Sequence, residues 1–176
     1  MVKAFGAAVV VGVAIVGVAF AGPQGSTYKL TANLKARSEV PKTVGVPASA
    51  VGLFTATAVL QRYGGAKITW RLSFSHLTGR ASGGAHIHRG KPGKAGGVMV
   101  ALCGACKSGQ KGTVTVTTAQ WKAIKAGGAY VNVHTAKNAA GEVRGQVKAS
   151  EAGSSSDPAP SPTPKPPPIP EPPPYP

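Results

Sequence analysis

Three histidines at strand-like spacing are the residues of this sequence best suited to chemistry. His86 and His88 lie in one extended segment, and because side chains alternate along a strand, both should project from the same face. In a second segment Asn132 and His134 should likewise share a face. Neutral imidazole is the commonest metal ligand among protein side chains. The spacing therefore predicts that His86, His88 and His134 converge on one metal site, provided that the two segments become neighbours.

The ligand types indicate which metal such a site would hold. Three imidazoles without a thiolate suit copper, which outbinds the other divalent first-row metals at nitrogen ligands, although zinc and nickel would also be accepted. Glu142 and Arg144 alternate on the strand expected after His134, and we expect them to orient an imidazole from behind. The alternative is a polar network that joins two strands and satisfies itself without a metal.

The two cysteines of the chain, Cys103 and Cys106, are separated by a glycine and an alanine. In an oxidising compartment this spacing can close a small disulfide ring. A redox-active pair is the alternative, but that chemistry usually relies on a helix N-terminus that lowers the pKa of the first thiol. A basic loop follows here, so the sequence favours a structural disulfide.

The two ends of the chain carry targeting and spacer signals. Residues 1–21 contain Lys3, a long apolar run and small residues up to Ala21, a pattern that predicts a cleaved signal peptide. An uncleaved anchor is the alternative, because the run approaches membrane-spanning length; cleavage would leave the mature protein without a transmembrane segment. Residues 151–176 are dominated by proline and are expected to form a disordered, extended tail. We expect a secreted or periplasmic protein of the cell envelope.

Residues 27–150 remain as one domain, and that domain is strongly basic. It holds eighteen of the chain's 20 lysines and arginines, opposed by Glu39 and Glu142. Such a balance favours binding to polyanions, for example an anionic component of the cell envelope. The lysines are scattered and aromatic residues are few, so specific nucleic-acid recognition by base stacking is not expected.

Alternating apolar and polar residues predict strands through most of this domain. The clearest is 67–75, in which every second residue is apolar. One helix is predicted after Thr118, which should cap it, with Trp121 and Ile124 on one side and Gly127-Gly128 at its end. Many short strands with one short helix indicate an all-β fold, a Greek-key-like β-sandwich or barrel.

Several motifs together resemble the CHRD domain, a family named after its occurrence in chordin. In the family's order they are Glu39-Val40-Pro41, Leu77-Thr78-Gly79, Ala85-His86-Ile87-His88, Val98 to Leu102, Asn132-Val133-His134-Thr135 and Gly141-Glu142-Val143-Arg144-Gly145-Gln146. They cover nearly all of the domain, with departures at Lys42 and His76. The resemblance implies a secreted β-rich module without a well-defined general enzymatic activity, so we expect a binding module rather than an enzyme.

A second similarity concerns the chemistry of the histidines. Copper/zinc superoxide dismutases present copper ligands from a His-x-His strand and a later histidine, and His86, His88 and His134 would be the matching positions. Arg144 would match the arginine that those enzymes place near copper. The zinc half is missing, because the loop after His88 offers lysine, glycine and proline. Two alternatives thus stand beside a copper-binding module: a copper-dependent oxidoreductase and a purely structural, adhesive polyanion-binding protein.

Overall fold

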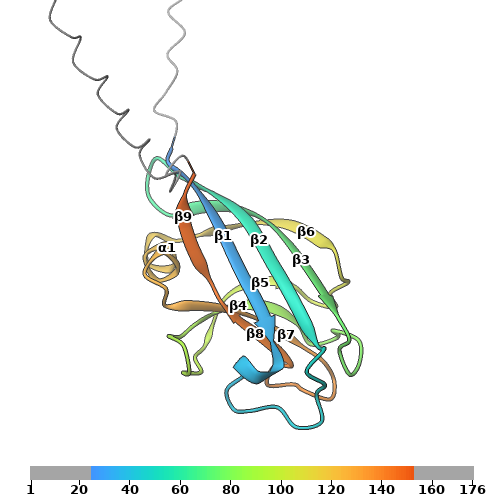
Figure 1. Ribbon diagram of the computed structural model, residues 1–176. Coiled ribbons are helices and arrows are strands. Elements are labelled where there is room, and N and C mark those ends of the chain that lie inside the picture. Colours follow the sequence, from blue (N-terminus) through green and yellow to red (C-terminus); the bar gives the residue numbers. More distant parts are fainter. Residues whose placement is uncertain (1–24, 153–176) are drawn as a thin grey trace, which may run out of the picture.

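The computed structural model describes residues 25–152, which form a single antiparallel sheet, one turn of 3-10 helix and one α-helix (Figure 1). The predicted signal peptide lies outside the described residues, as does the predicted tail beyond residue 152. No helix within the described range is long and apolar enough to cross a membrane. The all-β prediction with one short helix is confirmed.

The strands are short and follow one another closely along the chain. Their bounds are β1 Thr27–Lys35, β2 Val51–Leu60, β3 Ala66–Ser75, β4 Gly84–Arg89, β5 Val98–Cys103, β6 Gln110–Val116, β7 Ala129–His134, β8 Val143–Gln146 and β9 Lys148–Glu151. The 3-10 turn η1 (Ala36–Ser38) follows β1, and helix α1 (Thr118–Lys125) connects β6 to β7. In the sheet the order is β5-β4-β7-β8-β1-β2-β3-β6, with β9 beside β1. The sheet curls into a nearly closed barrel (Figure 1).

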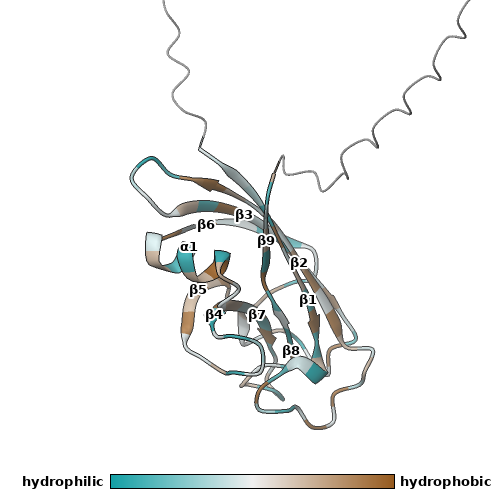
Figure 2. Cartoon of the chain, turned by 60° about the vertical axis from the view of Figure 1, so that its left-hand side comes forward, coloured by the Kyte–Doolittle hydropathy of each residue, from teal (hydrophilic) through white to brown (hydrophobic). Residues whose placement is uncertain are grey.

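Alternation along the strands decides which face of the sheet becomes the core. In β3 the apolar residues Ile68, Trp70 and Leu72 are buried and the residues between them are exposed. Figure 2 shows hydrophilic and hydrophobic segments succeeding one another along these strands. Burial of one such side chain stabilises the fold by about 1.5–3 kcal/mol. The inner face is therefore apolar, as the period of two predicts.

Strands β4 and β7 depart from this pattern because both of their faces are covered. Every residue of β7 is buried, including Asn132 and His134, which lie on the face opposite Val131 and Val133. In β4, Ile87 points into the core and His88 is buried on the other side. The polar residues of these two strands are thus removed from solvent although they do not belong to the apolar core.

Helix α1 begins one residue earlier than the sequence predicted, because Thr117 and not Thr118 caps it. The Gln120 backbone N–H donates to Thr117 Oγ1 at 3.2 Å, and the Thr117 N–H donates to Gln120 Oε1 at 2.8 Å. This reciprocal pair is a capping box. Trp121 and Ile124, which were expected on one side of the helix, are both buried, and Gly127 (φ 68°) follows the helix end.

Cys103 and Cys106 lie at disulfide distance, with an S–S separation of 2.05 Å and a Cα–Cα separation of 5.5 Å. The small ring lies against the start of β4, where Gly84 has φ 86°. A Cβ atom on Gly84 would come within 2.5 Å of the Cys103 carbonyl oxygen. Glycine is therefore required at the residue that leads into the histidine strand.

Candidate metal centre

The pairing of β4 with β7 decides where the histidines meet. The antiparallel register places His86 opposite Asn132 and Gly84 opposite His134. His134 is therefore the diagonal neighbour of His86 on the same face of the sheet. Gly84 brings no side chain to that position. Two histidine segments that are far apart in the sequence thus become adjacent.

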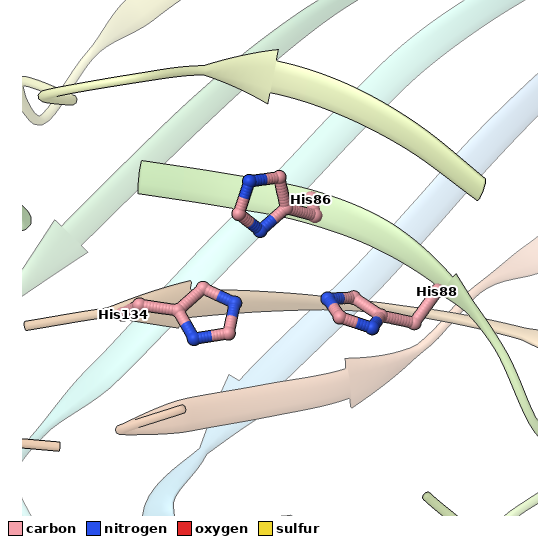
Figure 3. Close-up of side chains that lie close together, drawn as sticks. All are labelled: His86, His88 and His134. Carbon is pink, nitrogen blue, oxygen red and sulfur yellow. The ribbon is translucent and has the colours of Figure 1, made fainter. Parts of the chain in front are cut away.

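The three imidazoles gather around one point (Figure 3). Their ring centroids are 4.9 Å apart for His86 and His134, 5.6 Å for His86 and His88, and 5.7 Å for His88 and His134. One nitrogen from each ring can be chosen so that the three atoms lie within 4.8 Å of one another. His88 and His134 are 8% and 7% exposed, and His86 is partly exposed. A group this close could hold a metal ion.

Backbone carbonyls hold two of the rings and thereby set which nitrogen is free. His88 Nδ1 lies 2.9 Å from the Gly96 carbonyl oxygen, and His134 Nδ1 lies 3.0 Å from that of Ala139. A carbonyl only accepts, so each Nδ1 must carry the proton, and each Nε2 keeps a lone pair. Such outer hydrogen bonds are the usual way in which a metal-binding histidine is oriented.

Three of the four remaining ring nitrogens have no hydrogen-bond partner in the part of the chain that the structure describes. His88 Nε2, His134 Nε2 and His86 Nδ1 are buried without a hydrogen-bond partner among the described residues. Buried polar atoms in folded proteins nearly always have a partner. The alternative predicted from the sequence was a polar network without a metal. Such a network would have given each of these nitrogens a hydrogen-bond partner. Three unpartnered ring nitrogens at one place fit a metal ion better.

Burial also keeps the imidazoles in the form that binds metals. Desolvation lowers the pKa of His86 below 6.5, and the neighbouring His134 and His88 lower it further. Desolvation likewise lowers the pKa of His134; the hydrogen bond to Ala139 opposes this shift and His88 adds to it. Neutral imidazole is the ligating form, so protons compete weakly for these two residues at pH 7.

Glu142, predicted to orient an imidazole, instead joins two loops. It lies just before β8 and is completely buried, and its carboxylate accepts hydrogen bonds from the backbone and side chain of Thr78, from Thr135 and from Asn138. Burial raises the pKa of this carboxyl, but these hydrogen bonds outweigh it and the net pKa is lowered. The prediction was wrong because strand alternation does not extend to a loop residue. Glu142 stabilises the loop that carries Ala139.

Arg144 acts on the histidines indirectly, and the ring of Tyr130 is one of its links to them. Its guanidinium carbon lies 3.4 Å from the centroid of the Tyr130 ring. On its other side Tyr130 stacks on His88, with 5.0 Å between centroids and 12° between ring planes. Tyr130 pairs with His88 in the β4–β7 register, which explains the contact. Tyr130 lies on the same strand as His134 and on the same face of that strand. This alternation places Tyr130 on the histidine face, and it was not used to predict the site.

Arg144 and Tyr130 also fasten the loop of residues 90–97. Arg144 Nη2 donates to the Lys94 carbonyl at 2.7 Å, and the Tyr130 hydroxyl lies 3.2 Å from the Gly96 carbonyl. Gly96 supplies the carbonyl that holds His88. Both predicted supporting residues therefore act on the loops that orient the histidines, and neither acts on a ring directly.

Glu39 is a second buried carboxyl, to which the sequence assigned no role at this site. It is 2% exposed, and desolvation raises its pKa from 4.5 to about 7, against the opposing effects of Arg144 and of a hydrogen bond from Val40. A Cβ atom on Gly141 (φ 129°) would lie 2.6 Å from Glu39 Oε1 and 2.7 Å from Asn132 Nδ2. Glu39 is thus packed beside the strand that bears His134.

The family model described as the CHRD domain matches residues 30–147, more than half of the chain, and this range includes all three histidines and both cysteines. No curated protein and no solved structure gives a significant match. The similarity to copper/zinc superoxide dismutases is therefore not borne out. It rests on three histidine positions, and Arg144 lies over Tyr130 and not against the histidines.

Proposed function

Because the chain belongs to the CHRD domain family, we propose that it is an extracytoplasmic binding module whose His86, His88 and His134 bind one copper ion. CHRD domains are typically extracellular, which supports the predicted export to the envelope or beyond. The observation that carries the metal assignment is the convergence of three buried, unpartnered imidazole nitrogens. Copper is favoured because the group contains nitrogen ligands alone.

The surroundings of the site suit the binding of an ion. Two of the rings are held by backbone carbonyls and shielded by loops, while His86 remains partly exposed and offers an approach for the ion. No observation favours the copper-dependent oxidoreductase over a binding module. A superoxide or peroxide assay on the copper-loaded protein tests that alternative directly.

Calorimetric titration of the metal-free mature protein with Cu(II) tests the proposed function. We expect one ion per chain and tighter binding of Cu(II) than of Zn(II) or Ni(II). Because the pKa values of His86 and His134 are lowered, the affinity should change little between pH 8 and 7 and fall only as the pH drops below about 6.5. A stoichiometry well below one ion per chain at pH 7 would remove the proposal.

A further inference from the structure

The outer face of the sheet, across β9, β1, β2, β3 and β6, presents hydroxyl and cationic side chains in register. The cations of this basic face are Lys29, Lys35, Lys67, Arg71, Lys111 and Lys148, and its hydroxyl residues are Thr27, Thr31, Thr55, Thr57, Thr69, Ser73, Ser75, Thr113, Thr115 and Ser150. They occupy the positions that alternate with the buried core residues. The basic face is therefore a product of the same period of two that builds the core.

Strand pairing arranges these side chains in rows across the sheet. One row of successive partners is Lys148, Thr31, Thr55, Arg71 and Lys111, and the next is Ser150, Lys29, Thr57, Thr69 and Thr113. Neighbouring strands are about 4.8 Å apart, so a row is about 19 Å long, and successive rows are about 7 Å apart. A shallow hollow of about 430 Å³ lies within these rows, lined by residues that include Thr57, Thr69 and Arg71.

Carboxylates do not neutralise this face within the described residues. Glu39 and Glu142 are buried, which leaves Glu151 as the exposed acidic side chain of residues 25–152. Glu151 pairs with Tyr28, whose side chain points inward, so Glu151 and Lys148 lie on opposite faces of β9. Six cations on one face without an acidic partner attract a polyanion, and the attraction is screened by salt over about 10 Å at 0.1 M.

The other side chains of the basic face indicate the kind of polyanion. Threonine hydroxyls can donate to and accept from sugar hydroxyls. Trp70 is buried, and the exposed Tyr63 lies in the turn between β2 and β3, outside the rows of the basic face, so these rows offer a nucleic-acid base no aromatic ring on which to stack. The exposed apolar residues of this face, Val51, Leu53 and Val59, are too few to enter a membrane. We propose that the basic face binds an acidic polysaccharide, whose sulfate or carboxylate groups meet the lysines and arginine. This proposal goes beyond the metal site, which lies on β4 and β7.

The test compares two variants with the same loss of charge. K29Q/R71Q/K111Q removes three cations from the basic face, and R80Q/K122Q/K137Q removes three exposed cations from other surfaces. Binding to dextran sulfate, to polygalacturonate and to uncharged dextran is measured between 0.05 and about 0.3 M salt. We expect the face variant to bind one or both acidic chains at least about tenfold more weakly at 0.1 M salt, with a salt slope reduced by two to three. The control variant should lose less than about threefold.

Equal losses in the two variants would overturn the proposal, because they would show that net charge alone is sensed. Failure of the wild-type protein to bind either acidic chain would overturn it as well. A DNA duplex that binds as tightly and loses as much in the face variant would overturn the assignment to polysaccharide. The variant H86A/H88A/H134A should retain polysaccharide binding, which separates this proposal from that of the metal site.

Discussion

Replacing His88 or His134 with alanine should weaken Cu(II) binding at least about a hundredfold, whereas His76→Ala should leave it unchanged. Each of the first two changes removes one of three ligands. Loss of a group that merely orients a ligand already costs about 10–100-fold in metal affinity, so loss of a ligand should cost no less. His76 is exposed and belongs to no such group, which makes it the matched control.

Competition against a chelator of known affinity at pH 7.5 measures these differences. Circular dichroism and urea unfolding of each variant show whether the fold is retained, since His88 and His134 are both buried. Wild-type affinity in His134→Ala, or a similar loss in His76→Ala, would contradict the assignment of the ligands. The expected order of affinity is wild type equal to His76→Ala, then the single ligand variants, then the triple variant.

Glu142→Ala should destabilise the metal-free protein by about 3–5 kcal/mol. The substitution removes a completely buried carboxylate that accepts hydrogen bonds from Thr78, Thr135 and Asn138, and it leaves those donors without their partner. Urea unfolding at pH 7 measures the loss. A change below about 1 kcal/mol would show that the carboxylate is not what holds the two loops together.

The two buried carboxyls should respond to pH in opposite directions. The folded-state pKa of Glu142 is lowered, so its contribution is present above pH 4.5 and is lost as the pH falls through the folded-state pKa. The pKa of Glu39 is raised to about 7, so its contribution is present below pH 4.5 and is lost as the pH rises towards 7. Glu39→Gln should therefore gain stability relative to the wild type between pH 5 and 8, by on the order of 3 kcal/mol. An unchanged difference across that range would contradict the shift of Glu39.

Alternation along strands was sufficient to predict on which face of its strand each histidine lies. His86 and His88 had to share a face, with Ile87 in the core, because a strand repeats every two residues. That His134 lies beside them depends on the pairing of β4 with β7, and local sequence carries no information on which distant strands become neighbours. The sequence therefore predicted that the three histidines converge only if their two strands become neighbours, and the pairing of β4 with β7 meets that condition.

The supporting groups were harder to predict for two physical reasons. The carbonyls of Gly96 and Ala139 that hold His88 and His134 are backbone atoms, which every residue possesses, so no side-chain pattern identifies them. Glu142 was placed on a strand by alternation, although it lies one residue before β8. That Tyr130 lies on the histidine face could have been predicted, because Tyr130 and His134 are four residues apart on one strand. Its contact with His88 depends on the pairing of β4 with β7.

The helix start and the burial of Glu39 differ in the same way: a local sequence signal identifies the first, and the second depends on tertiary packing. Thr117 and Thr118 are both suitable N-cap residues, and only Thr117 has a glutamine three residues later to complete a capping box. The sequence therefore contained the deciding signal, in Gln120. No comparable signal announces that Glu39 is buried, because its burial depends on packing against Gly141 and Asn132 from the other end of the domain.

Copper K-edge X-ray absorption of the protein loaded with one equivalent of Cu(II) tests the central claim most directly. If His86, His88 and His134 are the ligands, the spectrum should contain three imidazole nitrogens at about 2 Å from the metal, with no sulfur contribution because both cysteines are paired with each other. The multiple scattering of the outer imidazole atoms counts the rings independently of the first coordination sphere. One imidazole or none, at full occupancy of the ion, would contradict the three-histidine site.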